Sequence, residues 1–272
     1  MIELFLAFIL GILLGSFINV VILRIPKDES IVFTPSHCYS CNTPLKPWHN
    51  IPIISWLCLR GKCSFCNSKI SIQYPIIELL SGLIFVVLAA KYSINFPIFL
   101  IAFSFLMLLA LSMIDFKYKM VPDSLNLLAL VFAIFGAWSI DGVLLNFQNA
   151  LLFAGGFTLL RFALSYLLTS SAHRQASKTI TPWTKNYHTY PFIEAMGEGD
   201  IMVAATMGAL LGVQLTLVAI FLSALLALPV MMAVRGRSAE EQRVPFVPFL
   251  ALATFIVYIF DSPILAYIEA NY

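Results

Sequence analysis

Two aspartates stand where the sequence changes between apolar and polar, and both could do chemistry. Asp200 follows two glycines that are one residue apart, Gly197 and Gly199, and it leads into the apolar run 201–212. Asp115 ends another apolar run. An ionisable side chain at membrane depth is costly to place and usually marks a functional site, and glycines permit a tight turn and a close approach of another segment. We therefore expect Asp115 and Asp200 to form one site.

A pair of carboxylates held close together shares a proton, because two adjacent like charges do not both ionise cheaply. The charged carboxylate can activate water while the protonated one polarises a carbonyl, which is hydrolysis of a peptide bond by general acid–base catalysis. The same pair could relay protons in a transporter, which predicts polar residues at mid-membrane positions, and the apolar segments contain few. A non-catalytic scaffold is the third interpretation, and it predicts that either aspartate can be replaced by asparagine without consequence.

Each carboxylate also has a structural interpretation. Asp200 stands at a predicted helix N-terminus, where capping and the helix dipole favour a negative charge. Asp115 stands at a predicted helix C-terminus, where the dipole disfavours that charge, so it needs another explanation. Asp123 follows Pro122 and fits the capping interpretation best. Glu78, in the first turns of another apolar segment, is either favoured by the dipole or faces the site.

The composition excludes an ordinary soluble domain, because 60% of the residues are hydrophobic and only 11% are charged. Several apolar runs approach the roughly 20 residues that cross a bilayer, and each should be helical because its backbone must satisfy its own hydrogen bonds. We predict an all-α polytopic membrane protein with about eight transmembrane helices, at residues 4–24, 74–91, 97–114, 123–140, 147–170, 200–213, 214–234 and 246–263.

The basic residues predict the orientation. If the N-terminus is outside and the spans alternate, 14 of the 16 Lys and Arg residues lie on one side, which marks the cytoplasm. Lys91 falls on the other side, and Arg161 lies within a span, from which it could reach the cytoplasmic face. Asp115 and Asp200 then both lie at the cytoplasmic face, so we expect an active site that faces the cytoplasm.

This topology divides the chain into a first transmembrane helix (1–24), a cytoplasmic segment (25–73) and a transmembrane domain (74–272). The transmembrane domain contains a second cytoplasmic stretch at 171–199, which is either a mobile loop or a gate to the site. The net charge of +2 gives no reason to expect a nucleic-acid partner.

Four of the five cysteines form two C-x-x-C pairs, Cys38 with Cys41 and Cys63 with Cys66. Four thiolates at this spacing are typical of a structural zinc site, and an asparagine after each pair suits a tight turn. A disulfide or redox pairing is the alternative, which a reducing cytoplasm disfavours. A closed four-thiolate site would staple the segment 25–73, which has little core of its own, and would not catalyse. We expect the fifth cysteine, Cys58, to be a small buried residue.

Taken together, these motifs resemble those of the type IV prepilin peptidases, bacterial members of the GxGD intramembrane aspartyl proteases. The resemblance runs nearly the full length of the chain. It rests on the paired cysteines and on the segments Gly15–Pro26, Tyr74–Glu78, Ile114–Asp115, Val121–Asp123, Met196–Asp200 and Val244–Phe249. Two positions depart from the pattern: Met202 stands where many relatives have lysine, and Val247 where many have glycine.

The resemblance implies that Asp115 and Asp200 are the catalytic pair, with Gly197, Gly199, Asp123 and Glu78 as supporting motif residues. It implies that the substrates are prepilin-like precursors of type IV pilus or protein-secretion systems, whose basic leader is removed at the cytoplasmic face of the bacterial inner membrane. It further implies methylation of the new N-terminus with S-adenosylmethionine, for which the sequence shows no nucleotide-binding fingerprint. The residues that would bind this cofactor are not identified by the sequence.

Overall fold

The computed structural model describes residues 1–92, 94–137, 142–179, 196–234 and 244–271, and of residues 172–179 only the backbone. The described residues form helices and no β-strand, as the composition predicts. The elements are α1 (Ile2–Arg24), η1 (Ile25–Lys27), η2 (Pro47–Asn50), α2 (Ile54–Cys58), α3 (Gln73–Lys91), α4 (Phe96–Tyr118), α5 (Asp123–Gly136), α7 (Val143–Thr179), α8 (Glu198–Val234), α9 (Val247–Ile259) and α10 (Asp261–Asn271).

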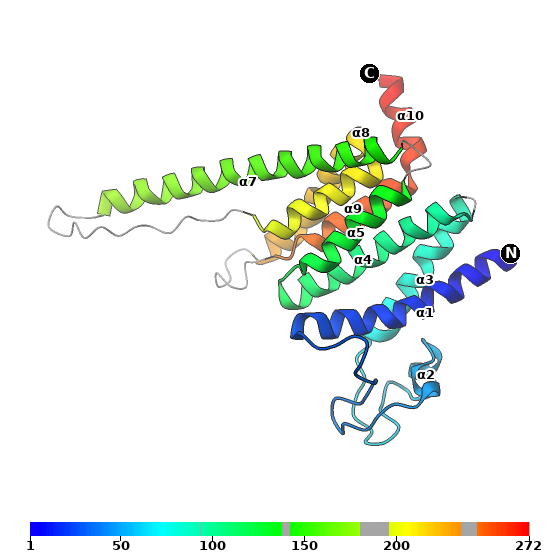
Figure 1. The fold of residues 1–272 in the computed structure, drawn as a ribbon. Coiled ribbons are helices and arrows are strands. Elements are labelled where there is room, and N and C mark those ends of the chain that lie inside the picture. Colours follow the sequence, from blue (N-terminus) through cyan, green and yellow to red (C-terminus); the bar gives the residue numbers. More distant parts are fainter. Residues whose placement is uncertain (93, 138–141, 180–195, 235–243, 272) are drawn as a thin grey trace.

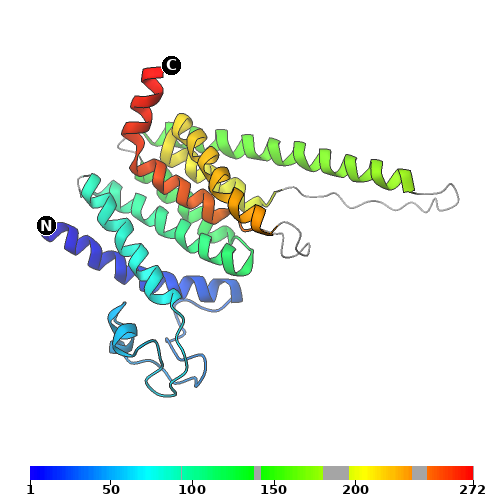
Figure 2. The same ribbon diagram turned by 180° about the vertical axis from the view of Figure 1, so that it is seen from behind.

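The long helices form one bundle, in which α1 and α3 lie at one edge, α4, α5 and α9 in the middle, and α8 and α7 at the other edge (Figure 1). The segment between α1 and α3 projects from one end of the bundle, and Figure 2 shows the same arrangement from behind. Buried aliphatic and aromatic side chains of α1, α3, α4, α5, α8 and α9 make one continuous core. The bundle therefore places the end of α4 and the start of α8 within one packed body.

Glycines set the distance between α1 and α3. A methyl group added at Gly11 would lie 2.8 Å from the Cα of Gly82, and one added at Gly15 would lie 2.8 Å from the Cα of Glu78. Membrane helices often pack through such close backbone contacts, because lipid tails are as apolar as the side chains and the hydrophobic effect does not bring the helices together. It fixes the first residues of α3 against α1.

α8 is a helical hairpin that turns at Gly212. Gly212 has φ 69° and ψ −174°, a conformation that glycine tolerates and other residues rarely adopt. The hydroxyl of Thr216 donates to the carbonyl of Met207 at 3.2 Å, whereas residues nine apart on a straight helix are separated by about 13.5 Å. The chain thus reverses at this point, where the sequence predicts one span to end at 213 and the next to begin at 214.

The predicted number of spans is not confirmed. By length and composition, five described helices could cross a membrane, or six if α9 and α10, which meet at 77°, are one broken span. α5 is apolar but has only 14 residues, or about 21 Å of helix, which is short of the roughly 30 Å core of a bilayer. The difference from eight therefore lies in the short helix α5 and in the reversal within α8.

The first residues of the predicted cytoplasmic stretch 171–199 are helical. α7 continues as helix to Thr179, since residues 171–179 include helix formers and no proline or glycine. α7 projects well beyond the neighbouring helices in both views (Figures 1 and 2). Residues 180–195 lie outside the described part of the chain. The same is true of residues 138–140, at the end of the predicted span 123–140.

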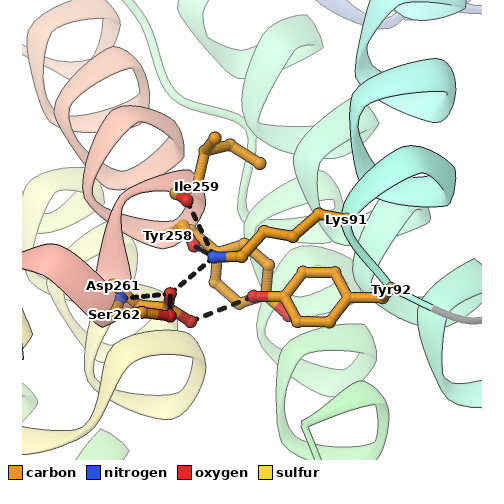
Figure 3. A network of polar contacts seen from close by, with 6 residues as sticks. All are labelled: Lys91, Tyr92, Tyr258, Ile259, Asp261 and Ser262. Carbon is orange, nitrogen blue, oxygen red and sulfur yellow. Dashed lines mark hydrogen bonds and ion pairs between the residues drawn. The ribbon is translucent and has the colours of Figure 1, made fainter.

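At the end of the bundle away from the cysteine segment, Lys91 ties α3 to the bend between α9 and α10 (Figure 3). Its ammonium donates to the carbonyls of Tyr258 (3.0 Å) and Ile259 (2.7 Å) and to the Asp261 carboxylate (2.5 Å). The last carbonyls of a helix lack partners within the helix. Lys91 supplies those partners, so the one basic residue predicted to lie outside has a structural role.

Candidate active site

Asp115 is buried in the last turn of α4, where its own helix dipole disfavours a negative charge. The structure supplies the missing explanation from another helix. The backbone N–H of Val247, at the start of α9, donates to Oδ2 of Asp115 at 3.2 Å, and the N–H of Phe246 bonds to the same carboxylate. The N-terminus of α9 thus holds this carboxylate, because unpaired N–H groups and the positive end of a helix favour an anion.

Asp200 is the third residue of α8, and its carboxylate accepts a hydrogen bond from the backbone N–H of Gly197, just before the helix. A side chain that reaches back in this way is half of a capping box. The structural interpretation of Asp200 therefore holds, and it does not exclude a chemical role. The carboxylate is half-buried, and the charge of Asp115 acts on it.

Gly199 is the residue that lets the start of α8 approach the end of α4. A methyl group added at Gly199 would lie 2.5 Å from Cβ of Val121, in the connection between α4 and α5. The side-chain amide of Asn126, buried on α5, donates to the carbonyl of Gly199 at 3.0 Å. α4 itself ends at Tyr118, and the N–H of the cap residue Lys119 donates to the carbonyl of Asp115 at 2.8 Å. These contacts bring the two predicted site aspartates to one end of the bundle.

The other motif residues lie in different surroundings. Gly197 is exposed, and a methyl group added there would meet only Oδ2 of Asp200, at 3.5 Å. Asp123 is the exposed first residue of α5, where the dipole favours its charge. Glu198 is also exposed and pairs with Arg161 of α7 at 3.0 Å, so Arg161 reaches the same end of the bundle as the motif.

Glu78 faces the cysteine segment. It is buried on α3, and its Oε2 accepts a hydrogen bond of 2.7 Å from the N–H of Ile53. Ile53 has φ 60° and ψ −51°, and the next N–H bonds back to the carbonyl of Pro52. A β-branched residue with positive φ in such a γ-turn is strained. Glu78 therefore fixes a strained turn of the segment 25–73 on the first turns of α3.

The four sulfur atoms of Cys38, Cys41, Cys63 and Cys66 lie within 4.8 Å of one another. The sulfurs of Cys38 and Cys66 are 3.8 Å apart, which is the edge of about 3.8 Å that a tetrahedron with metal–sulfur bonds of about 2.3 Å requires. It is far longer than the roughly 2.05 Å of a disulfide. The geometry fits a metal ion and not the disulfide alternative.

The two cysteine turns repeat one another. In each, the first cysteine's carbonyl accepts a hydrogen bond from an asparagine N–H, of Asn42 at 2.8 Å and of Asn67 at 2.9 Å. Both asparagines have positive φ, 54° and 58°, as the tight turns predicted at these positions demand. Backbone N–H groups of Cys41 and Ser40 lower the pKa of the Cys38 thiol to about 6. A thiol that ionises so readily is suited to bind a metal as thiolate.

Cys58 is exposed, so the prediction of a buried residue is wrong. It ends α2, a helix of five residues on the surface of the segment, in which Trp56 is the side chain that packs inward, under Gly61. The metal-ligand cluster found among the described residues consists of the four paired cysteines and includes neither Cys58 nor a histidine.

Sequence reasoning missed the partners of both aspartates. The N–H groups of Phe246 and Val247 act on Asp115 from a segment more than 130 residues away, and Asn126 and Val121 position Gly199. The signals available were the proline at position 248, which is typical of the first turn of a helix, and the motif segments Val121–Asp123 and Val244–Phe249, which contain three of these partners.

The fold and the site define a class: a polytopic helical membrane protein with a four-cysteine centre and two aspartates at one end of its bundle. Residues 9–92 match the model of the bacterial peptidase A24 N-terminal domain, and residues 102–232 match that of the type IV leader peptidase family. The chain belongs to the type IV leader peptidase family.

The curated relatives match this chain along nearly their whole length. A prepilin leader peptidase/N-methyltransferase from Neisseria gonorrhoeae is 34% identical over 93% of this chain and 89% of its own. Those from Xanthomonas campestris pv. campestris and Stutzerimonas stutzeri are each 31% identical, over 93% and 96% of this chain and 90% and 91% of their own. No solved structure matches the chain. The family supports prepilin processing and does not favour the transporter or scaffold interpretations.

Proposed function

We propose that Asp115 and Asp200 are the catalytic pair with which this membrane peptidase removes the leader from prepilin-like precursors. The observation that carries the proposal is the placement of Asp115. A buried carboxylate at the wrong end of its own helix is held by the N-terminus of α9, and its charge acts on Asp200 across the junction of α4, α5 and α8. A capping role within its own helix accounts for Asp200, whereas Asp115 is buried where its own helix disfavours its charge and depends on the N–H groups of α9.

The reaction needs only water and the two carboxylates. The ionised carboxylate takes a proton from water as the water oxygen bonds to the carbonyl carbon, while the protonated one gives its proton to the carbonyl oxygen. The tetrahedral species then loses the amine as the C–N bond breaks. The nitrogen leaves with a proton from the carboxyl that accepted it from water. As the C=O bond re-forms, one hydroxyl of the tetrahedral species returns its proton to the other carboxylate, so the pair again shares one proton.

The distribution of basic residues supports an N-terminus outside and an active site that faces the cytoplasm of a bacterial inner membrane. A precursor would then lie with its apolar helix beside the bundle and its basic leader among polar surroundings at the membrane face. The scissile bond between leader and helix would meet the aspartates at this boundary. The precursors of pili and of related secretion systems have this arrangement, as the family resemblance implies.

The four cysteines would hold zinc as thiolates. A closed four-thiolate site leaves no position for water, so the ion would stabilise the segment 25–73 and would not catalyse. That segment has two isolated β-bridges, His37 with Pro44 and Lys62 with Lys69, and three very short helices. So little regular structure makes a metal the main source of its order.

The names of the relatives support a second activity, methylation of the new N-terminus. S-adenosylmethionine would supply the methyl group when bound. The residues of this chain would have to hold the cofactor near the aspartates and present the new amine to it.

The test is mass spectrometry of a prepilin-like precursor incubated in detergent with the purified protein. The wild type and Glu198→Gln should release the leader, whereas Asp115→Asn should not. With S-adenosylmethionine present, the mature product should gain about 14 Da. Cleavage by Asp115→Asn at the wild-type rate would overturn the proposed pair, and an unchanged product mass would overturn the methyltransferase.

A further inference from the structure

The segment 25–73 exposes large apolar side chains although it lies outside the predicted spans. Trp48, Ile51, Ile54 and Leu57 are 59%, 44%, 58% and 61% exposed. They come from η2, from α2 and from the short connection between these helices. A group of exposed apolar side chains of this kind usually marks a surface that contacts another protein or a membrane. We refer to these four residues as the α2 patch.

The α2 patch lies on the outer side of η2 and α2. Other side chains of the same two helices, among them His49 and Trp56, line the cavity between the cysteine turns and α1 in the described part of the chain, and no residue of the patch does. Trp56 packs under Gly61, and its indole N–H donates to the carbonyl of Ile70 at 3.4 Å. η2 and α2 are therefore two-sided, with one face packed inward and the α2 patch facing outward.

Contacts with α1 and α3 fix the depth of α2. The carboxylate of Glu78 accepts a hydrogen bond of 2.7 Å from the N–H of Ile53, directly before α2. Glu78 lies opposite Gly15 of α1, where an added methyl group would meet the Cα of Glu78 at 2.8 Å. Gly15 stands nine residues before Arg24, the last residue of α1, which is about 13.5 Å of helix. α2 is therefore mounted beside α1 and α3 and not beyond their ends (Figure 1).

The helix that carries α2 has a surface that contacts lipid. α3 is long and apolar enough to cross a membrane, and Ile76, Leu79 and Leu83 are exposed on it at the spacing of one helix face. Ile72, directly before α3, is exposed as well. The apolar surface of α3 thus begins at the turns on which α2 is mounted, and the α2 patch adds to it at the same end of the span.

The charges around the patch select the kind of lipid. Residues 30–72 contain no Asp or Glu and four basic residues, Lys46, Arg60, Lys62 and Lys69. All four are exposed, and the ammonium of Lys46 lies 5.3 Å from the centre of the Trp48 ring. A zinc ion held by four thiolates would offset only part of this charge. Basic side chains around an apolar face that includes a tryptophan are typical of elements that lie in the interface of an anionic membrane.

We propose that the α2 patch inserts into the bilayer leaflet beside α1 and α3, and that Lys46 and Arg60, which flank the patch in the sequence, contact the head groups of anionic phospholipids. On the proposed topology this is the cytoplasmic leaflet. The four cysteines then stabilise an element that is anchored in the membrane, and not a free cytoplasmic domain. The hydrogen bond between Glu78 and Ile53 fixes the depth of this element, and the lipid covers its outer face. The proposal does not depend on which residues are catalytic.

Spin-label accessibility tests the insertion in the zinc-loaded, full-length protein, reconstituted in vesicles of phosphatidylethanolamine and phosphatidylglycerol. In a Cys58→Ser background, single nitroxide labels are placed by Leu57→Cys, by Leu83→Cys on the exposed face of α3, and by Glu29→Cys at an exposed position after the end of α1. Oxygen, which dissolves in the hydrocarbon, and a water-soluble nickel chelate are the two collision reagents. The label at 57 should resemble that at 83, with high accessibility to oxygen and low accessibility to nickel, and the label at 29 should show the reverse. Zinc content and leader cleavage show that each labelled variant is folded.

The contribution of the head groups is tested by removing either side of the attraction. Lys46→Gln combined with Arg60→Gln should increase the accessibility of the label at 57 to nickel, and phosphatidylcholine in place of phosphatidylglycerol should have the same effect. Lys62→Gln combined with Lys69→Gln is the matched control, because it removes the same charge from exposed positions that do not flank the patch. This control should leave the accessibility unchanged.

The outcomes distinguish lipid from water and from protein as the neighbour of the patch. A label at 57 that is as accessible to nickel as the label at 29 would place the patch in water and overturn the proposal. Low accessibility to both reagents would show that protein, such as a second copy of this chain, covers the patch, which also overturns it. High oxygen accessibility that neither the charge substitutions nor the lipid exchange changes would uphold the insertion and overturn the contact with anionic head groups.

Discussion

The two glycines before Asp200 are predicted to differ sharply in what they tolerate. A methyl group added at Gly199 would lie 2.5 Å from Cβ of Val121 and 2.7 Å from both of its Cγ atoms, whereas one added at Gly197 would meet only Oδ2 of Asp200, at 3.5 Å. Contacts under 3.0 Å force something to move, and Val121 is β-branched with few rotamers to adopt. Gly197→Ala should therefore cleave precursor nearly as the wild type does, and Gly199→Ala should not.

The size of the loss in activity depends on which residues the clash at Gly199 would displace. Overpacking of this kind costs about 1–3 kcal/mol, and the shift would displace the residue directly before Asp200. A displacement of about 1 Å at a catalytic group costs on the order of a hundred-fold in rate. We expect kcat/KM for leader cleavage to fall by about a hundred-fold in Gly199→Ala and by less than about three-fold in Gly197→Ala.

A compensating change gives the control. In the double variant Gly199→Ala with Val121→Gly, the clashing atoms of Val121 are removed, so cleavage should recover at least in part relative to Gly199→Ala. The assay is the initial rate of leader cleavage at matched amounts of folded, zinc-containing protein. Equal damage from both glycine substitutions, or wild-type cleavage by Gly199→Ala, would refute the packing argument.

Three further predictions concern the metal, the motif and the far end of the bundle. Cys63→Ser should lower the zinc bound per chain, measured by atomic absorption, and destabilise the segment 25–73. Cys58→Ser, at an exposed cysteine outside the cluster, should leave the zinc content unchanged. Equal loss of zinc in both variants would exclude the four-cysteine site. Glu198→Gln should cleave the leader at a rate within about two-fold of the wild type. Its ion pair with Arg161 is exposed on the glutamate side, and exposed pairs contribute less than about 1 kcal/mol. A large loss of cleavage would assign Glu198 a direct role. Lys91→Met should lower the free energy of unfolding by about 2 kcal/mol, because two helix-end carbonyls and Asp261 lose their hydrogen-bond donor. An unchanged melting temperature in detergent would show that the bend between α9 and α10 does not depend on Lys91.

The features that could be predicted from the sequence depend on a few adjacent residues. The two C-x-x-C pairs and their asparagines predicted the thiolate cluster and its paired turns, because ligand spacing and positive φ are properties of a few adjacent residues. The break between the sixth and seventh apolar segments was predictable from length alone, and the chain reverses there at Gly212. The candidate span in α7 ends at Ser171, close to the predicted end at 170, but the helix itself continues to Thr179. Polarity marks where an apolar span ends, whereas helix propensity decides where the helix ends.

The features that were not predictable depend on packing between distant segments. Asp115 looked anomalous at the C-terminus of a helix, and only the three-dimensional structure shows that α9 begins against it. The hydrogen bond from Ile53 to Glu78 likewise joins a strained turn to a membrane helix. The sequence shows that such carboxylates are costly, but it does not show which N–H groups offset the cost.

The central claim is that Asp115 and Asp200 act as one unit, and a comparison of Asp115→Asn, Asp200→Asn and the double variant tests it most directly. The measurement is kcat/KM for leader cleavage, on protein whose zinc content and melting temperature match the wild type. Residues that act together are strongly non-additive, so each single variant should lose more than about a thousand-fold and the double variant should be no worse than either. Substantial cleavage by either folded single variant, or losses that multiply in the double variant, would contradict the account.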